Sequence, residues 1–172
     1  NIAAEMLVRS APDGYTLILL PSGHASGAAM KKSLPFDPVK DFAWVSTITT
    51  YPLALTVAPG SPITSFADLV KRAKAEPNKV NFGSWGIGSP GHLGGEWLEM
   101  LTGTKMVHAP YKEVSQLYTS VANGDVAWSF ASIPSSQGVY KAGKIRYIAV
   151  AAPKRIPQLP DVPTVAEAGG PS

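Results

Sequence analysis

The alternation of apolar and polar positions divides the chain into two stretches of different regularity. From about residue 53 to residue 151, short apolar runs alternate with segments whose apolar residues recur at helical spacing. This order predicts an α/β domain of parallel β-α-β units, with helices covering the sheet. The expected strands are 79–84, 105–109, 125–132 and 144–152, preceded by a β-rich stretch over 43–58 that Tyr51-Pro52 divides. The expected helices are 64–75, 89–101, 115–122 and 136–142.

The first fifty residues carry fewer elements. Helical spacing over 2–10 is followed by a turn at Pro12-Asp13-Gly14 and by the apolar run 15–20, which predicts a buried strand. A short helix over 25–32 and an extended segment over 34–42 complete this part. These elements cannot bury their own apolar faces, so we expect a second, partly present domain. The predicted division is 1–50 for the partial first domain, 51–151 for the second domain, and 152–172 for a return hinge and further first-domain residues. The return segment is proline-rich and ends in a short helical piece over 165–169.

Composition excludes several function classes. The 172 residues are 45% hydrophobic, which is enough to fill a core, and only 16% are charged. The 15 basic and 12 acidic residues are scattered, whereas a nucleic-acid surface needs clustered basic groups. The net charge of +3 gives at most a mild preference for anionic ligands, and it serves solubility equally well.

The absence of cysteine excludes disulfides, thiol nucleophiles and cysteine-based zinc sites. No apolar segment approaches the roughly 18 to 20 residues of a membrane span. No leader peptide is visible, because the first residues read as the interior of a helix. We therefore expect the chain to begin inside a longer protein.

Residues 84–92, SWGIGSPGH, form the most conspicuous local motif. They follow a predicted strand, and Pro90 is placed to open a helix, where a missing N–H costs nothing. A helix N-terminus presents backbone N–H donors and a partial positive charge to an anion. Ser84 and Ser89 can add hydroxyl donors, so the loop predicts a site for a carboxylate or phosphate oxygen.

Other interpretations of the same loop remain open. Gly86 to Gly91 satisfies GxGxxG, but no acidic residue follows about 20 positions later, as a dinucleotide site requires, and the loop is not of the Walker type. The glycines can instead serve only close packing of helix on strand. His92, in the first helical turn, can face a ligand or pack into the domain.

Catalytic and metal-binding patterns are weak. Residues 23–27, GHASG, differ from an esterase elbow because the serine is fourth rather than third. The three histidines, His24, His92 and His108, show no metal-binding spacing. Five carboxylates lie beside turn residues and look like caps: Asp37, Asp41, Asp125, Asp161 and Glu167. We therefore expect no enzyme, no cofactor and no metal.

Six short motifs occur in an order that resembles one known family. They are Pro12-Asp13-Gly14-Tyr15-Thr16-Leu17, Leu34–Pro38 with Asp41-Phe42, Gly83-Ser84 through Gly88-Ser89 with His92, Pro110-Tyr111-Lys112, Lys141–Lys144, and Leu159–Thr164 with Glu167-Ala168-Gly169. The chain resembles the Bug/TctC family, the periplasmic solute-binding proteins of tripartite tricarboxylate transporters. The resemblance covers essentially all 172 residues, and the order and spacing of the motifs make it specific.

The resemblance implies a type II periplasmic binding protein fold, in which two α/β domains close on an organic acid. It implies hinges near residues 50–53 and 151–160, and a family chain that is longer at both ends. Loops of both domains hold the ligand in this family. By position, the second-domain loop corresponds to Ser84, Gly86, Gly88 and Ser89, and the first-domain loop to Ser22, Gly23 and His24.

Two residues depart from the family pattern. Glu113 replaces a glycine after Pro-Tyr-Lys, where it can cap the following helix or alter the charge near the ligand. Trp85 stands in the anion loop, where smaller residues are usual. Its indole can stack on an aromatic acid or cover the outside of the loop.

The expected partners are a small organic acid and the membrane permease subunits of a tripartite transporter, with no nucleic acid. Two rival functions remain: a module that senses a ligand for a signalling partner, and a hydrolase or dinucleotide-binding enzyme. A partly present domain exposes apolar faces and strand edges, so self-association is also expected.

Overall fold

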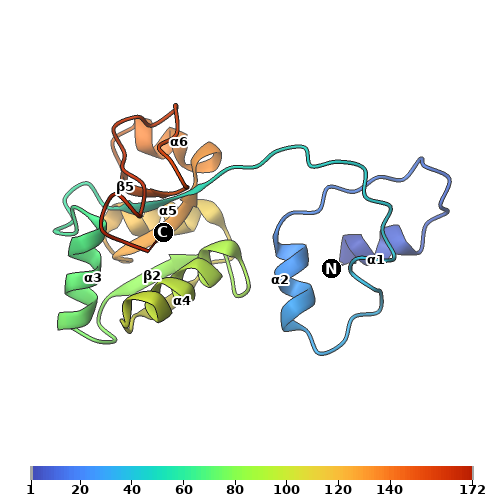
Figure 1. Ribbon diagram of the computed structural model, residues 1–172, viewed down its shortest axis with the longest axis horizontal. Coiled ribbons are helices and arrows are strands. Elements are labelled where there is room, and N and C mark those ends of the chain that lie inside the picture. Colours follow the sequence, from blue (N-terminus) through green and yellow to red (C-terminus); the bar gives the residue numbers. More distant parts are fainter. Residues whose placement is uncertain (1, 172) are drawn as a thin grey trace. The chain divides into compact units, whose positions relative to one another are not determined.

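The computed structural model describes residues 2–171 and divides the chain into two compact units. The first unit runs up to Thr49 and includes Gly88–Pro90, and the second contains Thr50–Ile87 and the residues from Gly91 onward. The helices are α1 (Ile2–Val8), α2 (Gly23–Met30), α3 (Phe66–Ala75), α4 (Pro90–Thr102), α5 (Val114–Asn123) and α6 (Ile133–Lys141), labelled in Figure 1. The strands are β1 (Leu53–Val57), β2 (Asn81–Ser84), β3 (Val107–Pro110), β4 (Trp128–Ser132) and β5 (Arg146–Ala151).

The second unit is built on a five-stranded sheet with the order β3-β2-β4-β1-β5. β2 pairs in parallel with β3 and β4, whereas β1 is antiparallel to both β4 and β5. The α/β class is confirmed, and the expected parallel pairing holds for β2 with β3 and β4 but is wrong for β1. A connecting helix favours parallel strands when those strands are neighbours. β1 and β2 are consecutive in sequence but not adjacent in the sheet, so α3 places no such constraint on β1.

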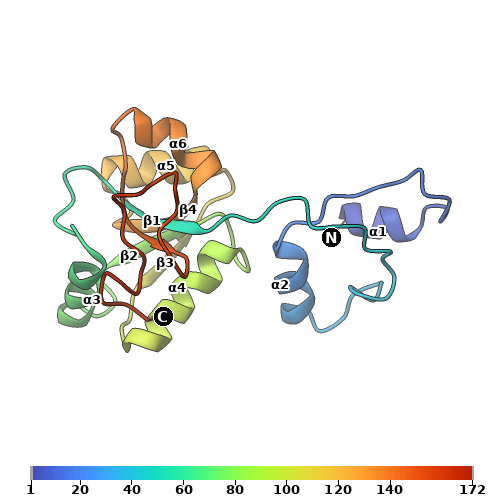
Figure 2. The ribbon, with the colours of Figure 1, turned by 45° about the horizontal axis from the view of Figure 1, so that its top comes forward.

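Helices cover both faces of this sheet, α3 and α4 on one side and α5 and α6 on the other (Figures 1 and 2). Each side has its own hydrophobic core, because alternate strand residues point to opposite faces. Leu55, Phe82 and Trp128 belong to the core beneath α3 and α4, and Ala54 and Val150 to the core beneath α5 and α6.

The helix ends follow the predicted signals. Ser65 caps α3 by accepting a hydrogen bond from the backbone N–H of Asp68, 3.1 Å away. Gly124 ends α5 in the left-handed conformation, with φ of 82°. Glu113 occupies the N-cap position of α5 but makes no side-chain capping bond. The start of α3 therefore depends on a side-chain hydrogen bond, and the end of α5 on backbone conformation.

The segment after β5 packs on the second unit, whereas the sequence predicts that 152–172 returns to the first domain. Val165 N–H donates to the carbonyl of Val150, and Leu159 and Val162 are buried in the core beneath α5 and α6. Residues 165–169 form turns and not the predicted helical piece. The predicted domain boundaries remain predictions, but the contacts of this segment differ from the expected return.

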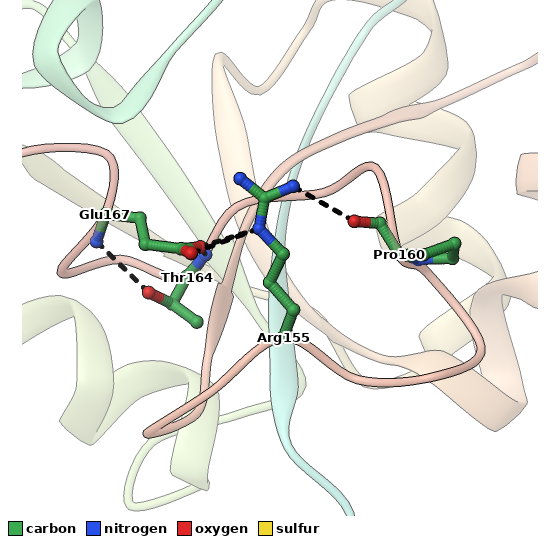
Figure 3. Close-up of polar contacts among 4 residues, drawn as sticks. All are labelled: Arg155, Pro160, Thr164 and Glu167. Atoms are coloured by element: carbon green, nitrogen blue, oxygen red, sulfur yellow. Dashed lines mark hydrogen bonds and ion pairs between the residues drawn. The ribbon is translucent and has the colours of Figure 1, made fainter.

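Glu167 organises this segment, as Figure 3 shows. Its Oε2 accepts hydrogen bonds from the backbone N–H of Thr164 at 2.8 Å and from Nε of Arg155 at 2.9 Å. Arg155 also donates to the carbonyl of Pro160. The hydrogen bond from Thr164, followed by the one from Arg155, lowers the pKa of Glu167. The prediction that Glu167 is a turn residue is confirmed.

The first unit contains α1, α2 and extended segments around a small aromatic core of Ala4, Phe36 and Phe42. The buried strand predicted over 15–20 is wrong. That segment has no regular structure, and Leu17 and Leu19 are 78% and 73% exposed. Within residues 2–52 no strand is present to pair with it. An apolar run becomes a buried strand only when a neighbouring strand takes its backbone hydrogen bonds.

The first half of the β-rich stretch 43–58 is also not a strand. Val45 and Ile48 are 85% and 77% exposed, whereas β1 in the second half is almost wholly buried. The two halves have similar β propensity, but only the second lies between two other strands. Tertiary context therefore decides which half becomes a strand.

Candidate functional site

The loop between β2 and α4 has the conformation that its glycines predict. Gly86 and Gly88 have φ of 113° and 78°, values that residues with a side chain rarely adopt. The chain then enters α4 at Pro90, whose fixed φ suits the first helical position. The backbone thus turns sharply between the end of β2 and the N-terminus of a 13-residue helix.

Further glycines let α4 lie close to the sheet. A Cβ at Gly95 would overlap the ring of Phe82, and one at Gly94 would lie 2.8 Å from the ring of Phe130. On β2, a Cβ at Gly83 would overlap the side chain of Leu117. The packing interpretation therefore holds for these three glycines, and the conformational one for Gly86 and Gly88.

Trp85 packs on its own unit. Its indole lies over Gly91, where an added Cβ would be 3.0 Å from the ring, and it contacts the hydrophobic cores on both sides of the sheet. This geometry supports the interpretation of Trp85 as packing cover. It also explains Gly91, since a larger residue there would displace the indole.

Ser84 holds the loop from within. Its side chain is fully buried, and Oγ accepts a hydrogen bond from the backbone N–H of Gly86 at 3.2 Å and donates to the carbonyl of Gly86 at 3.1 Å. The same Oγ lies 2.7 Å from Nε2 of His108 on β3. The structure therefore gives Ser84 a role in shaping the loop, and a direct contact between its hydroxyl and a ligand remains a prediction.

The two histidines of this unit lie side by side. The ring centroids of His92 and His108 are 4.2 Å apart, and Nε2 of His92 is 3.6 Å from a carboxylate oxygen of Glu96. The His108 ring stacks on Phe82 at 5.0 Å. Burial, followed by the neighbouring His92, lowers the pKa of His108 below its usual 6.5, and Glu96 opposes this effect. The packing interpretation of His92 is supported, and its contact with a ligand remains a prediction.

Sequence reasoning noted His108 but did not place it at the site. The signal that could have found it is strand register. His108 pairs with Phe82 and Pro110 with Ser84 in neighbouring parallel strands, so the ring of His108 can reach the end of β2. Register between two strands separated by a helix is not visible in local spacing.

The second predicted group, Ser22, Gly23 and His24, lies in the first unit. Gly23 and His24 are the first residues of α2, so the expectation that they form a loop is wrong. Ser22 is exposed and makes no side-chain capping bond. Nε2 of His24 lies 2.9 Å from the carbonyl oxygen of Pro38, and its ring is stacked on Phe36. His24 thus joins the aromatic core of this unit, and ligand binding by all three residues remains a prediction.

Other chemistry is sparse in the described part of the chain. Among residues 2–171, no group of three His, Asp or Glu side chains is placed to hold a metal ion. The same residues contain no helix of the length and apolar character that a membrane span requires. Two open hollows of about 430 and 550 Å³ occur in the second unit, and neither is lined by the predicted site residues.

Comparison with known proteins gives one consistent result. The family model described as the tripartite tricarboxylate transporter family receptor matches residues 1–171. A UPF0065 protein of Agrobacterium vitis is 33% identical over 98% of this chain and 49% of its own length. The chain spans about half the length of the curated relatives it matches.

Solved structures agree with this match. Rpa4515 of R. palustris, solved with adipate, superposes with a TM-score of 0.90 at 36% identity, over 99% of this chain and 57% of that one. MatC of Rhodopseudomonas palustris, solved with bound malate, gives a TM-score of 0.85 at 27% identity, over 99% and 58% of the two chains. Both similar structures therefore contain a small dicarboxylate.

Proposed function

Because the chain belongs to the tripartite tricarboxylate transporter receptor family, also called the Bug/TctC family, we propose that it contributes to capture of a small carboxylate for uptake by such a transporter. Members of this family are periplasmic solute-binding receptors. The proposed site is the loop of residues 84–92, with Gly86, Gly88 and Ser89 as its ligand-facing positions. The expected compartment is the periplasm, and the expected membrane partners are the permease subunits of the transporter.

The observation that carries this proposal is the glycine-rich turn at the N-terminus of α4. Gly86 and Gly88 hold the backbone in left-handed conformations, and Pro90 begins a helix whose partial positive charge favours an anion. The presence of adipate and malate in the two similar structures supports a carboxylate as that anion.

Magnitudes indicate how strongly this loop can bind by itself. Two hydrogen bonds to a charged group and one helix terminus contribute about 3–7 kcal/mol in total. Immobilising the ligand costs at least about 4 kcal/mol. We therefore expect millimolar or weaker binding by this loop alone, compared with the roughly 8 kcal/mol that a micromolar receptor needs.

The test is amide NMR of the 172-residue chain during titration with adipate and malate up to about 10 mM, a range suited to millimolar binding. 1,6-Hexanediol serves as the control, since it has the same chain length as adipate without the charges. We expect both acids to shift the amides of Gly86, Gly88 and Gly91, and hexanediol to leave them unchanged. Equal responses to adipate and hexanediol would overturn the proposal.

A matched pair of variants locates the site. Gly86→Ala and Gly143→Ala both place a side chain at a positive φ, and both positions have open space around an added Cβ. Only Gly86 belongs to the loop. Gly86→Ala should weaken the adipate response at least tenfold, and Gly143→Ala should preserve it.

A further inference from the structure

His108 reaches the turn of the loop through the side chain of Ser84. The residue lies on β3, the edge strand beside β2, and its ring is fixed by stacking on Phe82. From this position Nε2 reaches Oγ of Ser84 at 2.7 Å, and the same Oγ contacts both the N–H and the carbonyl of Gly86. A chain of two contacts therefore joins His108 to the peptide groups that shape the turn.

The hydrogen-bond capacity of Ser84 decides which atom carries the proton. A serine hydroxyl donates one hydrogen bond and accepts two. Oγ donates to the carbonyl of Gly86 and accepts from the N–H of Gly86. The one position left on Oγ is an acceptor, so Nε2 of His108 forms a hydrogen bond there only if it carries hydrogen and donates to Oγ. This arrangement favours the Nε2–H tautomer of neutral His108.

From these contacts we propose that His108 is a positioning residue for the ligand loop, which it orients by donating a hydrogen bond from Nε2 to Ser84. The proposal rests on the proposed function of the loop in carboxylate binding. His108 does not touch the ligand in this role. It fixes the rotamer of Ser84, and Ser84 in turn fixes the direction of the Gly86 N–H and carbonyl.

Protonation of His108 leaves this hydrogen bond in place and changes the charge beside it. Nε2 is a donor in both the neutral ring and the imidazolium, so the added proton goes to Nδ1. The titratable groups that face His108 are His92 and Glu96, both on α4. An imidazolium polarises its own donor, and a charge-assisted hydrogen bond is shorter and stronger than a neutral one. The amide of Gly86, one hydrogen bond further on, therefore reports the charge of His108.

The experiment follows the Gly86 amide and the His108 ring by ¹⁵N NMR as the pH is lowered, with no ligand present. We expect both signals to titrate with one midpoint, below 6.5. Three variants accompany the wild type. His108→Gln keeps a neutral N–H donor near the place of Nε2, His108→Phe keeps the stacked ring without the donor, and Val107→Thr alters an exposed neighbour on the same strand.

The expected pattern separates positioning from simple packing. His108→Gln should keep the Gly86 signal near its wild-type position and abolish its titration. His108→Phe should raise hydrogen exchange at Gly86 about tenfold and weaken the adipate response by a similar factor, and Val107→Thr should do neither. A Gly86 amide that ignores the titration of His108 in the wild type would overturn the proposal, as would equal behaviour of the Gln and Phe variants.

The two proposals fail separately. If adipate shifts the loop amides but Gly86 does not follow His108, carboxylate binding stands and the positioning role falls. If Gly86 follows His108 but no carboxylate perturbs the loop, the positioning contact stands and the proposed ligand class is wrong. The pH titration of the wild type needs no variant, so it remains decisive if His108→Phe does not fold.

Discussion

The two segments predicted to bind a ligand are held in different ways. In the loop of residues 84–92, the buried Ser84 forms hydrogen bonds with both the N–H and the carbonyl of Gly86, and glycines bring the following helix against the sheet. At residues 22–24, Ser22 is exposed without a capping bond, and His24 is fixed by one carbonyl and a few aromatic rings. The first loop is built into a layered core, whereas the second depends on a single side chain. A pre-arranged anion site is therefore better supported at residues 84–92.

Removing the glycine packing beneath α4 should have the largest effect. Gly95→Leu forces a side chain into the ring of Phe82, and overpacking of this kind costs about 3 kcal/mol. The matched control is Gly138→Leu on α6, where an added Cβ meets open space. That change should be neutral or stabilising by up to about 1 kcal/mol, because leucine favours helix more than glycine does. Urea unfolding followed by circular dichroism measures both. Similar losses in the two variants would mean that α4 is not held by close contact.

The next effect compares the serines of the two segments directly. Ser84→Ala leaves the N–H of Gly86 and the Nε2–H of His108 without their acceptor, at a cost of about 1–3 kcal/mol. Ser22→Ala removes an exposed hydroxyl that makes no capping bond, and should change the free energy of unfolding by less than about 0.5 kcal/mol. Thermal and urea unfolding of the two variants test this difference. If Ser22→Ala proves as costly as Ser84→Ala, the contrast between the two segments fails.

A smaller effect is expected in the first unit. His24→Ala removes the contact with the carbonyl of Pro38 and the ring contacts with Phe36 and Phe42, which together stabilise by about 1 kcal/mol. The suitable measurement is hydrogen exchange over residues 36–44, because global unfolding is dominated by the larger unit. Faster exchange confined to this segment is expected. Unchanged exchange would show that the aromatic core does not depend on His24.

The sequence predicted the second unit well because its signals are local. Helix caps such as Ser65, stops such as Gly124, and the turn at Gly86 and Gly88 each depend on a few neighbouring residues. The errors arose where long-range pairing decides the outcome. The apolar run 15–20 and strand β5 have similar patterns, yet only β5 lies beside another strand, and the direction of β1 depends on neighbours distant in sequence.

The candidate site shows the same contrast between local signals and long-range pairing. Local spacing predicted the glycine-rich turn of the loop and the start of α4, and both agree with the structure. Spacing could not show that Ser84 points inward to His108, because that contact joins residues 24 positions apart through strand register. For the same reason, spacing could not show that Trp85 contacts Gly91 and both cores, and its stacking on a ligand stays a prediction.

The smallest expected effect is a pH dependence that belongs to the loop of residues 84–92 alone. The pKa of His108 is lower in the folded chain than its usual 6.5. Below pH 6.5 the unfolded chain binds a proton that the folded chain does not yet bind. The free energy of unfolding therefore decreases as the pH is lowered, until the pH reaches the pKa of the folded chain. His108→Gln should remove this contribution. In a comparison of urea unfolding at about pH 7.5 and about pH 5.5, the variant should therefore lose less stability than the wild type.

Two charge variants on α4 fix the sign of this effect. His92→Gln removes the neighbouring imidazole that lowers the pKa of His108, so the variant should raise that pKa and narrow the pH range over which stability falls. Glu96→Gln removes the negative group that supports protonation, so it should lower that pKa and widen the range. Titration of the His108 ring by NMR in both variants gives the two midpoints. Shifts in the same direction in both would show that charge on α4 does not govern His108, and the link between this ring and the loop would then rest on the Ser84 contact alone.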